Sequence, residues 1–361
     1  MTNATITGWG NCLPPTVVTN DQLAELIDTS DEWISTRTGI KERRLCHVKT
    51  SDMAHIAAER ALAAAGVDAS EIDLIILATC TGDTLIPNTV SRVQQKLGAF
   101  NAAAMDINTA CSGFLYGLTM ARAQIETGLV KKVLIIGAEK LTAYMNWKYR
   151  KTAVIFGDGS GAVVLEATEE DHGILATAIG NDSKGADFLQ LPGFGTDMDR
   201  FKEGAGALTI VMDGQEVFKR AVAGMSQKSK KVLTDSGLSK DDIDLIIPHQ
   251  ANLRIIDAVV KRLGADPAKT FINIHKYGNT SAASIPIALA EAVEEGRIKP
   301  GSRILLTAFG AGLSVAAVAL KWGDRVTPIS TTDKDLPPCN QSFDELIAPA
   351  LEYYEKHFKE E

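Results

Sequence analysis

Cys111 is the residue of this chain best placed for nucleophilic chemistry. The mostly apolar run 102–107 predicts a buried strand, and from Phe114 apolar residues recur at helical spacing to about residue 128. Cys111 is therefore expected where a strand turns into a helix, with Gly113 allowing close backbone approach. The unpaired N–H groups and the dipole at a helix start favour the thiolate, which is the nucleophilic form. Taken alone, the cysteine also fits as a small buried apolar residue.

An internal repeat indicates how the chain positions this residue. Residues 64–76 resemble residues 235–247, and residues 123–128 resemble residues 291–296. The two matches occur in the same order at nearly equal offsets of 171 and 168 residues. This pattern predicts a duplicated domain.

Each half is predicted to alternate helix and strand three times. The ranges are about 53–65, 72–80, 88–97, 102–107, 112–127 and 132–138, then 214–236, 243–247, 251–263, 270–274, 281–295 and 302–308. Such alternation builds layered α/β structure, and strands that are nearly all apolar are buried on both faces. Glycine-rich runs at 156–161 and 309–312 occupy matching places, each before a strand of small residues. Neither opens a helix as a dinucleotide-binding loop requires.

The duplication would bring equivalent turns of the two halves to a cleft near a pseudo-twofold axis. His249 follows the predicted strand 243–247, and Asn279 comes just before the predicted helix 281–295. Taken singly, His249 fits a hydrogen-bonded buried histidine and Asn279 an ordinary helix cap. Together with Cys111 on a duplicated scaffold, they form one candidate catalytic site.

The composition is that of an ordinary globular protein. The 361 residues are 45% hydrophobic and 23% charged, and no apolar stretch reaches the length that spans a membrane. The net charge of −8 disfavours nucleic-acid binding. The five cysteines and six histidines show no metal-type spacing, so we expect reduced cysteines and no metal site. The N-terminus has no signal-peptide core, so we expect a cytoplasmic protein.

Five motifs in sequence order carry a family resemblance. They are 29–40 (TSDEWISTRTGI), 109–114 (TACSGF), 156–159 (FGDG), 248–255 (PHQANLRI) and 278–284 (GNTSAAS). Through them, the chain from about residue 5 to 322 resembles the 3-oxoacyl-[acyl-carrier-protein] synthase III family of the thiolase superfamily. The resemblance implies the thiolase fold, an internally duplicated, five-layered α-β-α-β-α architecture. One half, residues 1–170, would carry the nucleophile, and the other, residues 171–322, would carry the histidine and asparagine.

The resemblance also implies a reaction, the initiating condensation of fatty acid biosynthesis. Acyl-CoA and malonyl-acyl carrier protein would be its substrates, and no cofactor is implied. Cys111 would attack the acyl-CoA thioester to form an acyl-enzyme. Decarboxylation of the malonyl group would give a carbanion that attacks the acyl-Cys111 carbonyl. His249 and Asn279 would donate hydrogen bonds to the malonyl thioester oxygen as its charge develops.

Further roles rest on matching family positions. The backbone N–H groups of Cys111 and Ala311 would form an oxyanion hole, which depends on the φ of Ala311 because the family usually has glycine there. Five residues are assigned to substrate and coenzyme A binding: Trp33, Arg37, Arg150, Phe156 and Asn252. A tryptophan offers a stacking face for the adenine, and the arginines offer planar cations for stacking and for phosphate.

Basic residues gather on the two predicted helices that flank the His249 turn. They are Lys219, Arg220, Arg254, Lys261 and Arg262. Because carrier proteins are acidic, these residues suit a docking patch on an otherwise acidic enzyme. Ordinary solvated helix faces are the alternative. The resemblance also implies a homodimer, with no nucleic-acid or membrane partner.

The chain departs from the family pattern at two places. Ile86 stands where a family member often has a phenylalanine that projects across the dimer interface into the partner's acyl pocket. A smaller residue at this gate predicts tolerance of acyl groups longer than acetyl. The second departure is residues 323–361, a polar linker followed by a predicted amphipathic helix that docks on the body or on the dimer partner. Ser342 and Glu345 fit a capping box, while Pro349 requires a kink or a later helix start.

Two other functions stay open at this point. A transferase on the same scaffold would pass the acyl group to another acceptor, or join chains in specialised metabolism. A non-enzymatic partner in a synthase complex is the third reading, and the presence of all three catalytic residue types speaks against it. The Cys–His–Asn set and the basic patch favour the condensing enzyme.

Overall fold

The computed structural model describes residues 2–196 and 209–357. Its first half builds a five-stranded sheet in the order β1-β7-β6-β4-β5. The strands are β1 (Asn3–Cys12), β4 (Leu74–Ala78), β5 (Ala103–Ile107), β6 (Lys132–Lys140) and β7 (Asp158–Thr168). The helices of this half are α3 (Thr50–Ala65), α4 (Thr89–Leu97) and α5 (Gly113–Glu126). Strand β4 runs parallel to β5 and β6, whereas β7 runs antiparallel to β1 and β6.

The second half repeats this plan with one strand fewer. Its sheet has the order β11-β12-β13-β8, so that β8, β13, β12 and β11 take the places of β1, β7, β6 and β4. The strands are β8 (Gly173–Asn181), β11 (Leu245–Pro248), β12 (Arg303–Gly310) and β13 (Ser314–Lys321). The helices are α7 (Gly214–Asp235), α8 (Leu253–Leu263) and α10 (Ser284–Glu294).

The prediction of a strand at 270–274 is wrong. Only one bridge forms there, between Ile246 and Thr270. The side-chain oxygen of Gln250 instead accepts two backbone N–H groups of the segment, at 3.1 and 3.2 Å. The chain then turns into the short helix α9 (Ile274–Tyr277). A side chain thus replaces the strand partner, and the segment is free to lead into the Asn279 turn.

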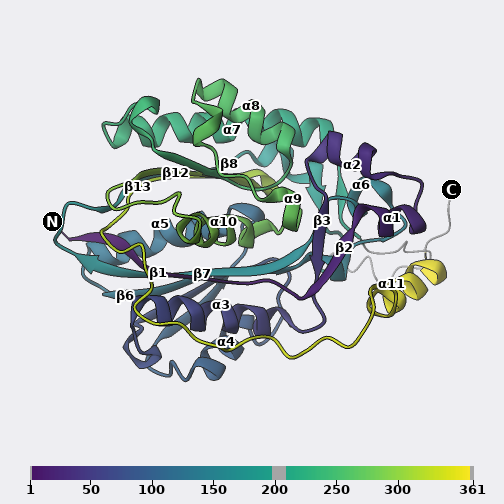
Figure 1. The fold of residues 1–361 in the computed structure, drawn as a ribbon, viewed down its shortest axis with the longest axis horizontal. Coiled ribbons are helices and arrows are strands. Elements are labelled where there is room, and N and C mark those ends of the chain that lie inside the picture. Colours follow the sequence, from purple (N-terminus) through teal and green to yellow (C-terminus); the bar gives the residue numbers. More distant parts are fainter. Residues whose placement is uncertain (1, 197–208, 358–361) are drawn as a thin grey trace.

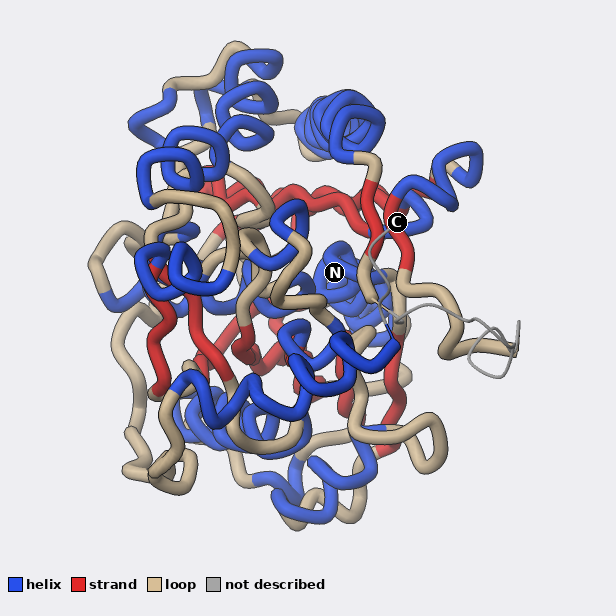
Figure 2. The backbone as a smooth tube through the Cα atoms, turned by 90° about the vertical axis from the view of Figure 1, so that its right-hand side faces the viewer, coloured by secondary structure: helices blue, strands red, loops and turns tan. Residues whose placement is uncertain are grey.

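The two sheets are separated and flanked by helices (Figure 1). From one side to the other lie α7 and α8, the second sheet, α5 and α10, the first sheet, and finally α3 and α4. The strands also separate into two groups in the view of Figure 2, with helices between them. Every residue of α10 from Ser284 to Val293 is buried, as expected of a helix enclosed on all sides. The five-layered α-β-α-β-α architecture is thereby confirmed.

Small elements attach to the first half beside the cleft. They are α1 (Asn20–Leu26), α2 (Asp31–Thr38), α6 (Arg150–Ala153) and the hairpin of β2 (Thr16–Thr19) and β3 (Glu42–Leu45). The fully buried Arg43 joins them, because its guanidinium donates to Asn20 Oδ1 at 2.8 Å and to Val154 O at 3.0 Å. Burial lowers the pKa of Arg43 to about 10. The arginine therefore ties the segment after α6 to the hairpin.

Beyond β13 the chain crosses the α3 side of the molecule before it ends in α11 (Phe343–His357) (Figure 1). Along the way, Ile329 N–H donates to Ala64 O at 3.0 Å and Arg60 donates to Lys334 O at 3.2 Å. Helix α11 turns Phe343, Ile347 and Tyr354 into the body, and the Phe343 ring lies 5.5 Å from that of Trp147.

The start of α11 has the reciprocal hydrogen bonds of a capping box. Ser342 N–H donates to Glu345 Oε2 at 2.7 Å, and Glu345 N–H donates to Ser342 Oγ at 3.2 Å. The helix nevertheless continues through Pro349. The capping box therefore marks the helix start, and the proline does not delay it.

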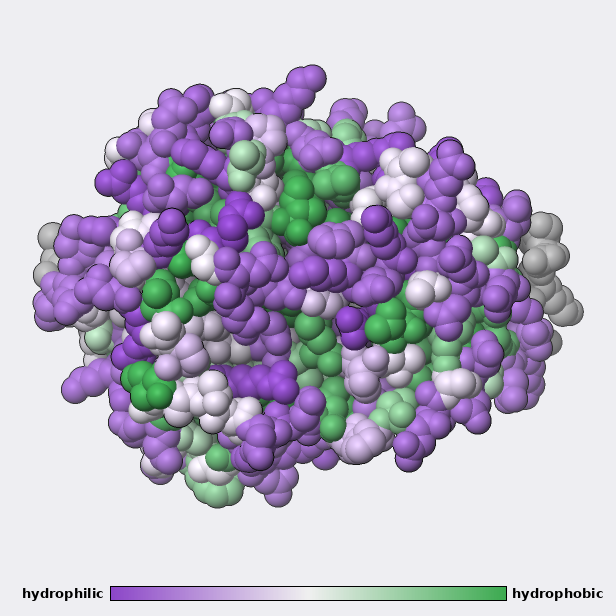
Figure 3. Space-filling view, viewed as in Figure 1, coloured by the Kyte–Doolittle hydropathy of each residue, from purple (hydrophilic) through white to green (hydrophobic). Residues whose placement is uncertain are grey.

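The surface shown in Figure 3 is mainly hydrophilic, with small separate apolar areas. Within residues 2–196 and 209–357, no helix is both long enough and apolar enough to cross a membrane.

Candidate active site

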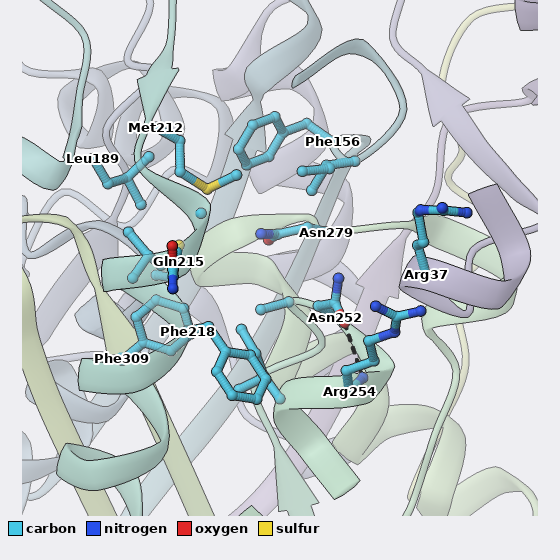
Figure 4. A pocket seen from close by; sticks show the side chains of 16 residues that line it. Arg37, Phe156, Leu189, Met212, Gln215, Phe218, Asn252, Arg254, Asn279 and Phe309 are labelled. Atoms are coloured by element: carbon cyan, nitrogen blue, oxygen red, sulfur yellow. Dashed lines mark hydrogen bonds between the residues drawn. The ribbon is translucent and has the colours of Figure 1, made fainter. Parts of the chain in front are cut away.

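A cavity of about 460 Å³ lies between the two halves (Figure 4). Among the residues that line it are Arg37, Cys111 and Phe156 of the first half and Asn252, Arg254, Asn279 and Phe309 of the second. The short antiparallel strands β9 (Leu189–Gln190) and β10 (Val211–Met212) contribute Leu189 and Met212 to another side. Six of the sequence-predicted site residues therefore line one cavity.

Cys111 lies in a single 3-10 turn, Ala110–Ser112, that leads directly into α5. The turn is held by the start of β13, because Ser112 Oγ donates to Ser314 Oγ at 2.7 Å and Ser314 Oγ donates to Thr109 O at 2.8 Å. A Cβ on Gly113 would come within 2.9 Å of the Ala78 Cβ. Glycine is therefore needed for the helix start to pack this closely on β4.

The environment of the Cys111 thiol differs from the one expected at a helix start. Burial is the largest influence and raises the pKa of Cys111 to about 12, whereas a hydrogen bond with Ser281 lowers it and the charge of Glu139 raises it. The resting residue is therefore a thiol. The sequence-based expectation of a thiolate was wrong because desolvation outweighs the helix N-terminus.

His249 lies at the end of β11 and is 1% exposed. Its ring makes an edge contact with Phe309, which lines the cavity, at a centroid distance of 5.7 Å. Nδ1 lies 2.6 Å from Ser284 Oγ, and Nε2 has no hydrogen-bond partner among the described residues. Because Ser284 Oγ also receives the Gln250 N–H, its own hydrogen is assigned to Nδ1, and the imidazole proton is then on Nε2. His249 is thus a neutral donor.

The buried His249 should make the protein sensitive to acid. Burial lowers the pKa of His249 to about 3. Below about pH 6.5, His249 therefore binds a proton in the unfolded state but not in the folded state. The contribution of neutral His249 to the free energy of unfolding is complete above pH 6.5. It is lost as pH falls toward 3, by about 1.4 kcal/mol for each pH unit. Urea unfolding at pH 7 and pH 5 should show a larger loss in wild type than in His249→Gln. Equal losses in the two proteins would contradict the assignment.

Asn279 precedes α10 and is bonded to both halves. Its backbone N–H donates to Ile155 O at 2.9 Å, and its carbonyl accepts the Gly157 N–H at 3.1 Å. Its side-chain Oδ1 accepts the Ser281 N–H at 2.8 Å. The Nδ2 group is then left as the donor on a side chain that lines the cavity (Figure 4).

The duplication extends to the conformation of the two turns. Ala110 and Ser281, 171 residues apart, have φ of +47° and +49°, and no other described non-glycine residue has positive φ. Each stands first in a 3-10 turn that opens a central helix, α5 or α10. Such left-handed backbone is uncommon outside glycine and concentrates at functional sites. The two turns are therefore structural counterparts.

The loop after β12 approaches the nucleophile closely. A Cβ on Gly310 would lie 2.8 Å from the Cys111 nitrogen. Ala311 follows, and it is not among the described non-glycine residues with positive φ. An alanine is therefore compatible with the backbone at the position where the family usually has glycine.

Trp33 and two arginines form a stacked group beside the cavity. The guanidinium carbon of Arg37 lies 4.5 Å from the Trp33 ring centroid, and that of Arg150 lies 4.8 Å from it. Arg150 also donates to Asp28 O at 2.7 Å. This spacing leaves no room for another planar group between Trp33 and Arg150.

Asn252 and Phe156 both line the cavity. Asn252 caps α8, with Oδ1 accepting the Arg254 N–H at 2.9 Å, and its Nδ2 is on the cavity side (Figure 4). Phe156 pairs through its backbone with Asn279.

The predicted docking residues have different surroundings. Arg254 is exposed and lines the cavity, and Lys219, Lys261 and Arg262 are exposed on α7 and α8. Arg220 is engaged in ion pairs with Asp182 at 2.5 Å and Glu216 at 3.3 Å. Its charge is therefore compensated within the chain. Ile86 is 85% exposed, beside the equally exposed Leu85.

The sequence did not predict a functional role for three residues near the cavity. Ser281 and Ser284 lie within the GNTSAAS motif, but nothing in the sequence shows that they face the cysteine and the histidine. Glu139 is a fully buried carboxylate at the end of the apolar strand β6. An acidic residue ending a buried apolar strand was the available signal.

No cluster of His, Cys, Asp or Glu suited to a metal ion occurs in the part of the chain that the structure describes. The five cysteines are all unpaired with one another. The fold and the cleft define a duplicated thiolase-fold protein with a cysteine at the start of one central helix and an asparagine before the other.

Comparison with known proteins places the chain more narrowly. Models of 3-oxoacyl-[acyl-carrier-protein] synthase III and of its C-terminal part match residues 105–183 and 233–322. The beta-ketoacyl-[acyl-carrier-protein] synthase III 2 of Vibrio cholerae is 52% identical over 357 residues, 99% of each chain. The corresponding synthase III of Caldanaerobacter subterraneus is 50% identical over 323 residues, 88% of this chain and 98% of its own. The chain belongs to the 3-oxoacyl-[acyl-carrier-protein] synthase III family.

Solved structures agree. The synthase III of Aquifex aeolicus has a TM-score of 0.84 and 46% identity, covering 88% of this chain and all of its own. The priming beta-ketosynthase of the R1128 polyketide pathway has a TM-score of 0.85 and 35% identity, covering 89% of this chain and 97% of its own.

Proposed function

We propose that this protein condenses an acyl-CoA with malonyl-acyl carrier protein, with loss of carbon dioxide, to give 3-oxoacyl-acyl carrier protein in fatty acid biosynthesis. The observation that supports it most is the meeting of Cys111 and Asn279 in one cavity, with His249 in ring contact with the cavity wall. A nucleophile and two neutral hydrogen-bond donors are what such a condensation needs.

In the first half-reaction, Cys111 Sγ attacks the thioester carbonyl of the acyl-CoA. The bond to the coenzyme sulfur breaks, and coenzyme A leaves as the thiol with the proton that Cys111 gives up. The backbone N–H groups of Cys111 and Ala311 stabilise the oxyanion of the tetrahedral intermediate. The product is acyl-Cys111.

In the second half-reaction, the malonyl thioester loses carbon dioxide to form an enolate. His249 Nε2 and Asn279 Nδ2 donate to its oxygen, which carries the developing charge. Both donors are neutral, so neither transfers its proton to the substrate when the enolate forms. The enolate carbon attacks the acyl-Cys111 carbonyl, and the Cys111 thiol is regenerated after protonation.

Trp33 is proposed to stack on the adenine of coenzyme A, with Arg150 closing from the other side and Arg37 meeting the phosphates. Stacking of a base on an aromatic ring contributes about 1–3 kcal/mol. Trp33→Ala should therefore raise the KM for acyl-CoA about tenfold and leave kcat nearly unchanged, because this contact does not change in the transition state. Acyl-pantetheine, which lacks the adenine, serves as the control substrate. An equal effect on both substrates would contradict the stacking role.

The carrier protein is proposed to dock on the exposed cations Arg254, Lys219, Lys261 and Arg262. Arg254 is the best placed of these, because it is exposed and also lines the cavity. Arg220 is less available, since Asp182 and Glu216 already compensate its charge.

Acyl chain length is proposed to depend on Ile86 in a homodimer. The exposure of Ile86 and Leu85 in the single chain suits residues that a partner subunit covers. Ile86→Phe should lower the ratio of kcat/KM for hexanoyl-CoA to that for acetyl-CoA at least about tenfold. Leu129→Phe, at another exposed apolar site, should leave the ratio unchanged. A wild-type protein that strongly prefers acetyl-CoA over butyryl-CoA would contradict the proposal.

The proposed function is tested by exposing the protein to a panel of acyl-CoAs and locating adducts by mass spectrometry. The expected result is one acyl group on Cys111. The proposed function would be overturned if no acyl-CoA of the panel gave an adduct, or if the adduct persisted in Cys111→Ala.

A further inference from the structure

Glu139 is a buried carboxylate for which the proposed mechanism has no role. It is completely shielded from solvent near the end of β6. Its oxygens accept hydrogen bonds from Thr79 Oγ, Cys80 N and Ser281 Oγ at 3.2, 3.2 and 3.0 Å, and also from Thr81 Oγ. No cation pairs with it anywhere in residues 2–196 and 209–357. These donors stabilise the ionised carboxylate, whereas burial without a counter-ion raises its pKa and favours protonation.

Ser281 joins this carboxylate to the nucleophile. Its hydroxyl lies 3.0 Å from Glu139 Oε1, and the 3-10 turn that carries Ser281 contacts the turn that carries Cys111. Hydrogen bonding by Ser281 lowers the pKa of Cys111. The left-handed backbone of Ser281 and the hydrogen bond from its N–H to Asn279 Oδ1 define the backbone from which this hydroxyl projects.

A close backbone approach holds the Ser281 turn against β6. A Cβ on Gly137 would lie 2.3 Å from the Ala282 carbonyl oxygen. Glycine two residues before Glu139 therefore lets the turn that carries Ser281 reach the strand that carries the carboxylate. The chain Cys111–Ser281–Glu139 is thus built from three separate elements.

The two ends of this chain cannot both be charged without cost. Burial raises the pKa of Cys111 and that of Glu139, and the charge of Glu139 raises the pKa of Cys111 further. Moving one proton from the thiol to the carboxylate keeps a single negative charge in the site. A single negative charge in the site therefore costs less than two.

We propose that Ser281 relays the proton of Cys111 to Glu139 during acylation, an inference that rests on the proposed function. Cys111 S–H gives its proton to Ser281 Oγ while the Ser281 hydroxyl proton passes to Glu139 Oε1. The resulting thiolate attacks the acyl-CoA carbonyl, and the bond to the coenzyme sulfur breaks. The proton returns from Glu139 through Ser281 to the leaving coenzyme thiolate, so the site ends with the carboxylate restored.

Two other titratable groups beside Glu139, the Cys80 thiol and the Tyr144 hydroxyl, remain neutral. The Cys80 thiol lies 3.3 Å from Glu139 Oε1, and the Tyr144 hydroxyl is close enough to feel its charge. Burial raises the pKa of both Cys80 and Tyr144. Lys140, the next residue, directs its amine to Val48 O at 2.9 Å. Glu139 is thus the only one of these groups with a basic form available at neutral pH.

The test is the pH dependence of the acylation rate of Cys111, measured by rapid quench and mass spectrometry between about pH 6 and pH 9. With the relay, the wild-type rate is flat over this range, because the reacting form (thiolate with protonated carboxyl) carries as many protons as the resting form (thiol with carboxylate). In Glu139→Gln the rate should fall about 10²-fold at pH 7 and should rise tenfold per pH unit. Ser281→Ala should behave in the same way, and alanine fits this backbone since Ala110 has the same φ.

Contrary results separate the alternatives. If Glu139 were only a neighbouring charge, wild type would already rise with pH and Glu139→Gln would be faster at every pH. A flat profile that survives in both variants would assign the proton to another acceptor. Either result overturns the relay.

Two controls keep the test decisive. Asp158→Asn removes another fully buried carboxylate, one bonded to Thr142 and Cys46, and should lower Tm without changing the acylation profile. The rate of Cys111 alkylation by iodoacetamide should likewise be independent of pH in wild type. In Glu139→Gln and Ser281→Ala it should fall at pH 7 and rise with pH. Alkylation needs no acyl-CoA, so it tests the relay even if wild type forms no acyl adduct. A missing acyl adduct would then count against the proposed function and not against the relay.

Discussion

Replacing Cys111 with alanine should abolish the acyl adduct and lower condensation by at least about 10³-fold. Cys111 is 7% exposed and lines a cavity formed by both halves, and no other described cysteine lines that cavity. Cys80 is nearby, but burial raises its pKa well above the usual value, and it hydrogen-bonds Glu139. It should not replace Cys111 as the nucleophile.

The measurement is the rate of 3-oxoacyl product formation, with intact-protein mass spectra to count acyl groups. Cys80→Ala is the matched control and should keep the adduct at Cys111. An adduct that moves to Cys80 in Cys111→Ala, with activity retained, would contradict the assignment.

Replacing His249 with alanine should slow decarboxylation of malonyl-acyl carrier protein by about 10²–10³-fold, the usual effect of removing one donor from a developing oxyanion. Acylation of Cys111 should change little, because the neutral His249 is not proposed to take the thiol proton. Carbon dioxide release and adduct formation, measured separately, distinguish the two half-reactions.

Ser284→Ala is the control for the tautomer of His249. It removes the partner of Nδ1 but leaves the ring, so the decarboxylation rate should fall by less than in His249→Ala. Equal loss of both half-reactions in His249→Ala would instead indicate that the histidine acts by supporting the structure of the cleft.

Much of the fold could be predicted from the sequence because the apolar runs and the repeat are local signals. The helix α5 and the strand β5 lie within a residue of their predicted bounds. The strand at 270–274 could not be excluded, since the group that replaces its partner is the side chain of Gln250, some twenty residues away.

The candidate site was predictable where residues stand at the ends of elements, as Cys111, His249 and Asn279 do. Its electrostatics were not. The raised pKa of Cys111 follows from burial, and the Glu139 carboxylate hydrogen-bonds Ser281, which lies 142 residues further along. Likewise, the ion pair that occupies Arg220 depends on Asp182 in a distant loop. Such effects depend on three-dimensional packing rather than on spacing in the sequence.

Cys111 is proposed to carry an acyl group to a carbanion made by decarboxylation. The direct measurement is a single turnover in which acyl-Cys111 is formed, excess acyl-CoA is removed and carboxyl-labelled malonyl-acyl carrier protein is added. One carbon dioxide should be released for each acyl-Cys111 consumed and for each 3-oxoacyl-acyl carrier protein formed. Transfer of the acyl group without release of carbon dioxide would contradict it.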